Sequence, residues 1–226
     1  MKISFCITCY YRDVHLLQDR IEEIATGQTV LPDEIVVIAS GMPDGSMRCL
    51  DPRIKIYTFP ERMLPGGARN KGGELFSGDV VCFCDVDDPI HPQKCEIVKK
   101  IFSENPNVDA LVHNFNFDEG DLDEIYDTSN IEIERILEVD PRWENEQKHI
   151  FEPHKDIPRT CVIAPSKKPI HHGHLSGRAE MFKTLKYRED MWLGEDGDFC
   201  QSIVKSDYNL YYTPLILINY ITTKDK

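Results

Sequence analysis

The sequence predicts an α/β fold with a mostly parallel central sheet that is covered by helices on both faces. Short runs of strand-forming residues recur along the first half of the chain, and segments with helical spacing of apolar residues separate them. Continuous apolar runs, such as residues 34–39 and 80–84, are typical of parallel strands with two buried faces. The chain has 226 residues, of which 41% are hydrophobic, and this favours one domain with a sizeable core.

The elements of the first half follow this alternation in order. Strands are predicted at residues 2–8, 34–39, 54–59, 80–84 and 110–115, and helices at 16–27, from the glycine-rich residues 65–73 to 76, and at 92–102. Polar or glycine-containing breaks separate them, as at Ser40-Gly41. This half is therefore expected to form repeated βαβ units of the Rossmann-like kind.

The second half is less regular. Residues 118–140 contain ten acidic residues and one basic residue, and we interpret them as an insertion with a short helix at 131–139. A solvated charged excursion explains this run about as well as a functional segment does. Helices at 177–185 and 196–205 and closing strands at 209–221 are expected to complete the domain.

The charge of the chain limits the classes of partner. The formal net charge is −13, so the overall field repels nucleic acid and anionic lipid, and duplex nucleic acid is not an expected partner. An anionic ligand would need a local basic or metal-bearing site. A bound divalent cation is therefore expected wherever such a ligand binds.

The cysteines and the N-terminus predict a cytoplasmic protein. Residues 1–6 begin with strand-like sequence and lack the pattern of a signal peptide, and no apolar run has the roughly 20 residues of a transmembrane segment. The eight cysteines are read as reduced core residues. Cys6 and Cys9 form a C-x-x-C pattern, but positions three apart on a strand face opposite sides, which argues against a joint metal site.

Three carboxylates directly follow a predicted buried strand. They are Asp85, Asp87 and Asp88, and in open α/β sheets ligands bind beyond the carboxyl ends of such strands. In extended geometry Asp85 and Asp87 project to the same side, so that one can reach a sugar hydroxyl while the other binds a hard divalent cation. Because clustered carboxylates repel one another, a cation would relieve that cost.

Three further patterns have both a functional and a structural explanation. Arg69, in a glycine-rich stretch that matches neither common phosphate-loop motif, could bring positive charge to a nucleotide, or the glycines could merely let a helix approach the sheet. Glu195 and Asp196 could be ordinary acidic residues at a helix start, or supply a general base. His172 and His174 would share one face of a strand and could line a site.

Taken in order, these residues resemble a GT-A glycosyltransferase of the family 2 type. The resemblance rests on four segments. They are the strand leading into Thr8-Cys9-Tyr10-Tyr11-Arg12, the residues 66–72 with the pattern G-x-A-R-N-x-G, the residues 78–88 with G-D-V followed by D-x-D-D, and the residues 194–196. It spans nearly the whole chain. It implies a single GT-A domain over residues 1–226, in which 1–116 bind the nucleotide sugar and 117–226 the acceptor.

The resemblance also implies roles for individual residues. Thr8, Tyr10 and Arg12 would hold the nucleobase, and Arg69 would contact the nucleobase or the diphosphate. Asp85 would bind the ribose or the sugar. Asp87, together with Asp85, would bind a Mn²⁺ or Mg²⁺ ion. Asp196 would be the general base, and Glu195 would lie beside it. The reaction implied is an inverting transfer of a hexose from a nucleotide sugar to a hydroxyl of a glycan or other acceptor, and a UDP-sugar is the simplest choice of donor.

Two departures from the family pattern affect the donor and metal sites. The second strand ends in Ala39-Ser40-Gly41 where an acidic pair commonly reads uracil, so base recognition would fall to Ser40 or Asp44. In addition, no histidine follows His174 to serve as a late metal ligand. Trp143, His172 and His174 are the candidates for acceptor binding in the second half.

Two other classes of protein share parts of this pattern. A sugar-phosphate nucleotidyltransferase should have a glycine-rich signature after its first strand, whereas residues 8–12 contain no glycine. A catalytically inactive GT-A-like module that binds carbohydrate or nucleotide is the non-enzyme alternative. Retention of both acidic motifs argues against it.

Overall fold

The structure is a computed structural model, and it describes residues 1–117, 120–139, 161–164, 169–170, 174–192 and 194–221. Its elements in chain order are β1 (Ile3–Tyr10), η1 (Tyr11–Leu16), α1 (Leu17–Thr26), β2 (Glu34–Ser40), β3 (Ile54–Phe59), α2 (Pro65–Leu75), β4 (Val80–Asp85), α3 (Lys94–Glu104), β5 (Ala110–Phe117), β6 (Glu134–Arg135), β7 (Glu138–Val139), β8 (Cys161–Ala164), β9 (Pro169–Ile170), β10 (Ser176–Arg178), α5 (Ala179–Thr184), α6 (Glu195–Val204) and β11 (Leu210–Tyr220).

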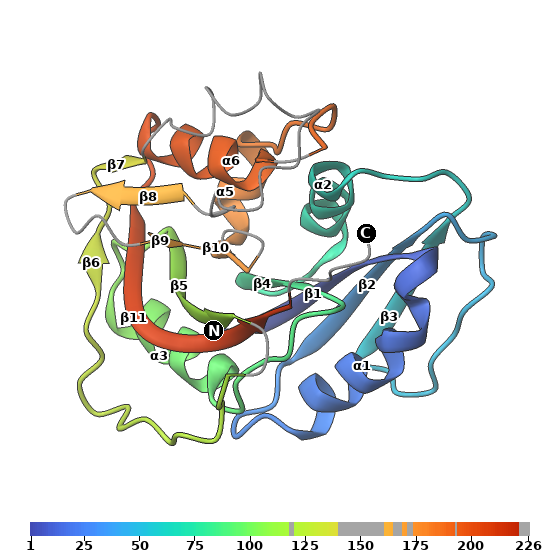
Figure 1. Ribbon diagram of the computed structural model, residues 1–226, viewed down its shortest axis with the longest axis horizontal. Coiled ribbons are helices and arrows are strands. Elements are labelled where there is room, and N and C mark those ends of the chain that lie inside the picture. The colour runs from blue at the N-terminus through green and yellow to red at the C-terminus, as the bar shows by residue number, and fades with distance from the viewer. Residues whose placement is uncertain (118–119, 140–160, 165–168, 171–173, 193, 222–226) are drawn as a thin grey trace.

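Within these residues one eight-stranded sheet runs through both halves of the chain, in the order β3-β2-β1-β4-β10-β5-β11-β6 (Figure 1). β1 pairs in parallel with β2 and β4, β2 with β3, and β5 with β11, whereas β10 and the edge strand β6 are antiparallel to their neighbours. The strands β7, β8 and β9 form a separate small sheet. The predicted α/β class with a mostly parallel sheet is confirmed.

Helices cover both faces of the sheet, and each face has its own core. One core combines residues of α1 and α3 with one set of strand side chains, including Phe5, Ile7 and Val37. The other combines residues of α2, α5 and α6 with the alternate set, including Cys6, Val36 and Phe83 (Figure 1). Because adjacent strand positions are buried on opposite faces, the inner strands read as continuous apolar runs.

The cysteines behave largely as the sequence predicts. Seven cysteines of the described chain are free, and all of these except Cys49 are buried. Cys6 and Cys9 belong to the cores on opposite faces of the sheet, so they do not form a joint site. In the described residues, no helix combines the length and the apolar character that crossing a membrane requires.

Three local predictions are wrong. Residues 131–139 form the short strands β6 and β7 instead of a helix, because β6 pairs with the free edge of β11. Gly177 lies in β10, between β4 and β5, and the helix α5 begins only at Ala179. The closing segment is one strand, β11, with register shifts along its pairing with β5.

The described part of the acidic segment is attached to the domain instead of standing free in solvent. The Tyr126 ring stacks on His91 with centroids 4.8 Å apart, and its hydroxyl donates to the Ile216 carbonyl at 3.2 Å. The Tyr126 backbone N–H donates to Gln93 at 2.7 Å. These contacts give Tyr126 a structural role at the edge of β11.

Candidate active site

Parallel pairing brings the carboxyl ends of β1, β2 and β4 to one edge of the sheet. In this register Tyr10 lies opposite Ser40, and Thr8 lies opposite Asp85. The Thr8 hydroxyl donates to Asp85 Oδ1 at 3.0 Å. Three of the predicted donor-binding positions, Thr8, Ser40 and Asp85, therefore lie on neighbouring strands at the edge where ligands bind in such sheets.

Arg69 connects this edge to the second half of the chain. Its Nη2 donates to both Asp85 oxygens, at 3.0 and 3.2 Å, and its Nη1 donates to Glu195 Oε1 at 2.6 Å. The Arg69 side chain is only 2% exposed. The two acidic motifs, which are more than 100 residues apart in sequence, thus meet at one guanidinium group.

The glycines of α2 explain how Arg69 reaches this position. A Cβ at Gly72 would lie 2.3 Å from Cys6 Sγ on β1, and one at Gly66 would lie 2.4 Å from the Arg188 carbonyl oxygen. Both distances are too short for a side chain, so α2 can approach the sheet and the loop before α6 only with glycine there. The explanation that the glycines let a helix approach the sheet is therefore confirmed at Gly72, whereas Gly66 permits a close approach to the loop.

Glu195 and Asp196 form the start of α6 but have different surroundings. Gly194, with φ of 82°, makes the left-handed turn that leads into the helix. Glu195 is 4% exposed and is held by Arg69, whereas Asp196 is half-buried. Burial and the adjacent Asp196 carboxylate raise the pKa of Glu195, whereas the hydrogen-bonded Arg69 guanidinium lowers it and favours the charged carboxylate.

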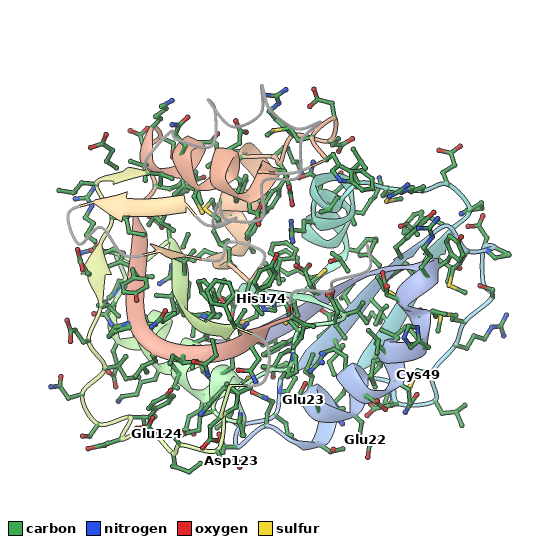
Figure 2. The ribbon with its side chains drawn as sticks, viewed as in Figure 1. Glu22, Glu23, Cys49, Asp123, Glu124 and His174 are labelled. Carbon is green, nitrogen blue, oxygen red and sulfur yellow. The ribbon has the colours of Figure 1, made fainter. Side chains whose placement is uncertain are left out.

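A second, fully buried network lies beside the carboxylates. His174 Nε2 and Asp88 Oδ2 are 2.8 Å apart, and His174 Nδ1 lies 3.2 Å from Lys94 Nζ. The Ile221 backbone N–H donates to Asp88 Oδ1 at 2.9 Å. Figure 2 shows His174 near the centre of the molecule, and its ring is 0% exposed. Burial, with the Asp85 and Asp87 charges, raises the pKa of Asp88, and burial lowers the pKa of Lys94.

Three side chains at this edge form a group that could hold a divalent cation. One atom from each of Asp85, Asp88 and His174 lies within 4.8 Å of the others. Carboxylate oxygens suit Mg²⁺ and Mn²⁺, and an added imidazole nitrogen is compatible with transition metals such as Mn²⁺. The cluster differs from the predicted ligand pair by including Asp88 and His174. Asp87, the other predicted ligand, is half-buried in the turn that follows β4.

The remaining predicted residues lie around this centre or outside the described chain. Arg12 is exposed on η1, with its guanidinium carbon 5.9 Å from the centre of the Tyr11 ring. His174 was predicted to bind acceptor, and the structure places it in the interior with Asp88 and Lys94. Trp143 and His172 lie outside the described residues.

Sequence reasoning missed two relationships. Lys94 had no signal, because a lysine at a helix start is ordinarily exposed, and here the whole side chain is buried. The Arg69 to Glu195 pair had only a weak signal in the arginine of the glycine-rich segment. Both relationships join segments far apart in sequence, so local pattern could not show them.

The fold is that of solved GT-A glycosyltransferases. The crystal structure of S. aureus TarS residues 1–349 in complex with UDP-GlcNAc matches with a TM-score of 0.65 and 15% identity, covering 100% of this chain and 60% of that one. Mannosyltransferase PcManGT from Pyrobaculum calidifontis, in complex with GDP-Man and Mn²⁺, matches with a TM-score of 0.63 and 18% identity, covering 99% and 58%. At these identities the likeness shows the fold.

Residues 4–186 match the model of the family described as glycosyl transferase family 2, and the chain belongs to this family. A curated relative, an uncharacterized glycosyltransferase of Haemophilus influenzae, is 28% identical over 121 residues, which cover 49% of this chain and 38% of the relative. The match thus covers between 38% and 60% of the length of these three proteins.

Proposed function

We propose that this chain is a metal-dependent, inverting glycosyltransferase that moves a hexose from a nucleotide sugar, with UDP as the first candidate nucleotide, to a hydroxyl group of a glycan or other acceptor. The observation that carries the proposal is the meeting of Asp85 and Glu195 at Arg69. It brings the acidic motif of the donor half to the acidic pair at the start of α6. Family membership supports the same reaction class.

Asp196 is proposed as the general base. Glu195 is buried and bound to Arg69, so its carboxylate is committed to the ion pair, whereas the adjacent Asp196 is more accessible. The acceptor oxygen would form a bond to the anomeric carbon as the bond from that carbon to the diphosphate oxygen breaks. Asp196 would take the acceptor proton, and the nucleoside diphosphate would leave, so no covalent enzyme intermediate is needed.

The donor would bind at the carboxyl edge of β1, β2 and β4. The nucleobase is proposed to be held by four residues, Thr8, Tyr10, Arg12 and Ser40. Asp85 is proposed to bind the ribose or the sugar. A cation held by Asp87 and Asp85, with Asp88 and His174 alongside, would supply Lewis-acid stabilisation of the diphosphate. Arg69 reaches this region through Asp85, and a contact with the nucleotide stays a prediction. A cytoplasmic location and the division at residue 116 also stay predictions.

A nucleotide-sugar panel tests the proposal. The complexes of the two similar structures make UDP-GlcNAc and GDP-mannose the first donors to examine. Binding is measured by calorimetry and by thermal shift in Mn²⁺ and in EDTA, and donor hydrolysis by release of nucleoside diphosphate. We expect metal-dependent binding and slow hydrolysis of at least one donor. Equal affinity in EDTA would refute metal dependence, and binding without hydrolysis or transfer would favour the inactive module.

A further inference from the structure

Trp192 is the most exposed large aromatic side chain of the described chain, at 59% exposure. It lies in the loop between α5 and α6, two residues before Gly194, where the turn into α6 begins. Asp196, the proposed base, follows within one helical turn. The exposed ring therefore stands on the loop that leads directly into the helix carrying the proposed base.

The loop that carries Trp192 is anchored to α2. Asn70 Nδ2 donates to the Tyr187 carbonyl and to Glu189 Oε1, both at 2.9 Å, and the Tyr187 backbone N–H donates to Asn70 Oδ1 at 2.9 Å. Met191, beside Trp192, is 5% exposed. The exposure of the indole is therefore a property of an anchored loop.

Arg62 fixes the indole from one side. Its guanidinium carbon lies 4.4 Å from the centre of the Trp192 ring and 4.7 Å from the centre of the Tyr10 ring. In both contacts the guanidinium lies over an aromatic ring, whose electron-rich face attracts a cation. Arg62 therefore links the end of β1, in the donor half, to the loop that precedes the acidic pair.

We propose that Trp192 is the platform on which a pyranose ring of a carbohydrate acceptor stacks. The proposal rests on the proposed function and adds the chemical class of the acceptor. An indole face is apolar, and so is the C–H face of a pyranose, while the sugar hydroxyls stay free to hydrogen-bond at the rim. A sugar on Trp192 would lie next to Asp196, which would receive its hydroxyl proton. Arg62, behind the ring, keeps the platform oriented.

Fluorescence can test this directly, because the chain contains only two tryptophans, Trp143 and Trp192. In the Trp143→Phe variant Trp192 is the one reporter. We expect at least one neutral disaccharide among cellobiose, maltose, lactose and chitobiose to change its emission saturably in the presence of UDP and Mn²⁺. Arg62→Ala in this background should weaken that affinity severalfold, whereas Leu31→Ala, an exposed position before β2, should not.

Three results would overturn the proposal. The first is no emission change with any of the disaccharides. The second is an equal change with UDP or GDP alone, which would make Trp192 a nucleobase contact. The third is the same saccharide response in the converse variant Trp192→Phe, which would place the acceptor at Trp143.

A second measurement avoids the Trp143→Phe variant. A disaccharide that raises the Tm of the unmodified chain should lose at least tenfold in affinity in Trp192→Ala, and unchanged affinity would also overturn the proposal. Failure of the proposed function is recognised separately, because it is shown by the absence of nucleotide-sugar binding and hydrolysis in the unmodified chain. Neither saccharide titration requires turnover.

Discussion

Arg69 on α2 and Glu195 on α6 form a buried ion pair in which Nη1 and Oε1 are 2.6 Å apart and the side chains are 2% and 6% exposed. The same guanidinium also binds Asp85 at the end of β4. One cation therefore compensates two carboxylates from the two acidic motifs, and the position of each motif depends on it. This arrangement makes Arg69 both a structural link and part of the proposed active centre.

Replacing Arg69 by methionine should strongly destabilise the fold. The change leaves Glu195 buried without its cationic partner, and breaking a buried ion pair in this way typically costs about 3–5 kcal/mol. Urea unfolding at pH 7 measures the change, with Arg12→Met as an exposed arginine control. Combined with Glu195→Gln, the loss should be smaller than the sum of the two single losses. Additive losses would mean that the pair is not coupled.

Asp196→Asn should lower kcat while leaving donor affinity nearly unchanged. The amide cannot accept the acceptor proton, and removing a general base typically costs at least ~10²-fold in rate. The measurement is transfer and donor binding in the same preparation. Asp198→Asn, in the same first turn of α6, is the matched control. If Asp196→Asn keeps near-normal turnover while Glu195→Gln loses turnover at unchanged stability, the general base is Glu195 and not Asp196.

The regular part of the fold could be predicted from local pattern. The strands at residues 34–40 and 80–85 contain continuous apolar runs because both of their faces are buried, and such runs are visible in the sequence. Residues 131–139 could not be assigned this way. Their apolar positions fit more than one period, and the choice of strand depends on the free edge of β11, which is a tertiary feature.

The site was predictable in its acidic motifs but not in their partners. Asp85 and Asp196 stand at a strand end and a helix start, which are local features. The contact of Lys94 with His174 and that of Arg69 with Glu195 join residues 80 and 126 positions apart. The packing of α2 on one face of the sheet and of α3 on the other brings these residues together. Spacing along the sequence therefore could not reveal the two contacts.

Asp87→Ala should abolish metal-dependent donor binding, and His174→Gln should weaken it. His174 is hydrogen-bonded to Asp88, and loss of such a supporting contact typically lowers metal affinity by about 10–100-fold. Titration of Mn²⁺ followed by electron paramagnetic resonance measures the affinity without turnover. His15→Gln, an exposed histidine, is the control. Equal Mn²⁺ affinity in the His15 and His174 variants would remove His174 from the metal site.

The Glu34 carboxylate should make the fold sensitive to acid. Glu34 opens β2 at the amino edge of the sheet, away from the proposed site, and it accepts hydrogen bonds from Lys55 Nζ at 2.5 Å, Ser4 Oγ at 2.7 Å and the Ser77 backbone N–H at 2.7 Å. Burial alone would raise the pKa of Glu34, but these hydrogen bonds outweigh it and lower the pKa below the usual 4.5. The folded state therefore binds this proton less readily than the unfolded chain does.

The sign of the pH effect follows from that lowered pKa. The stabilisation by Glu34 is fully present above about pH 4.5 and is lost as the pH falls through the pKa of the folded state. We expect Glu34→Gln to lower the free energy of unfolding at pH 7. The free energy of unfolding of this variant should also decline less steeply as the pH falls. Urea unfolding between about pH 7 and pH 3, a range that includes the titration of carboxylates, measures both effects. Glu22→Gln, on the exposed side of α1, is the matched control. A Glu34→Gln variant whose stability declines as steeply in acid as that of the unmodified chain would show that Glu34 does not carry the effect.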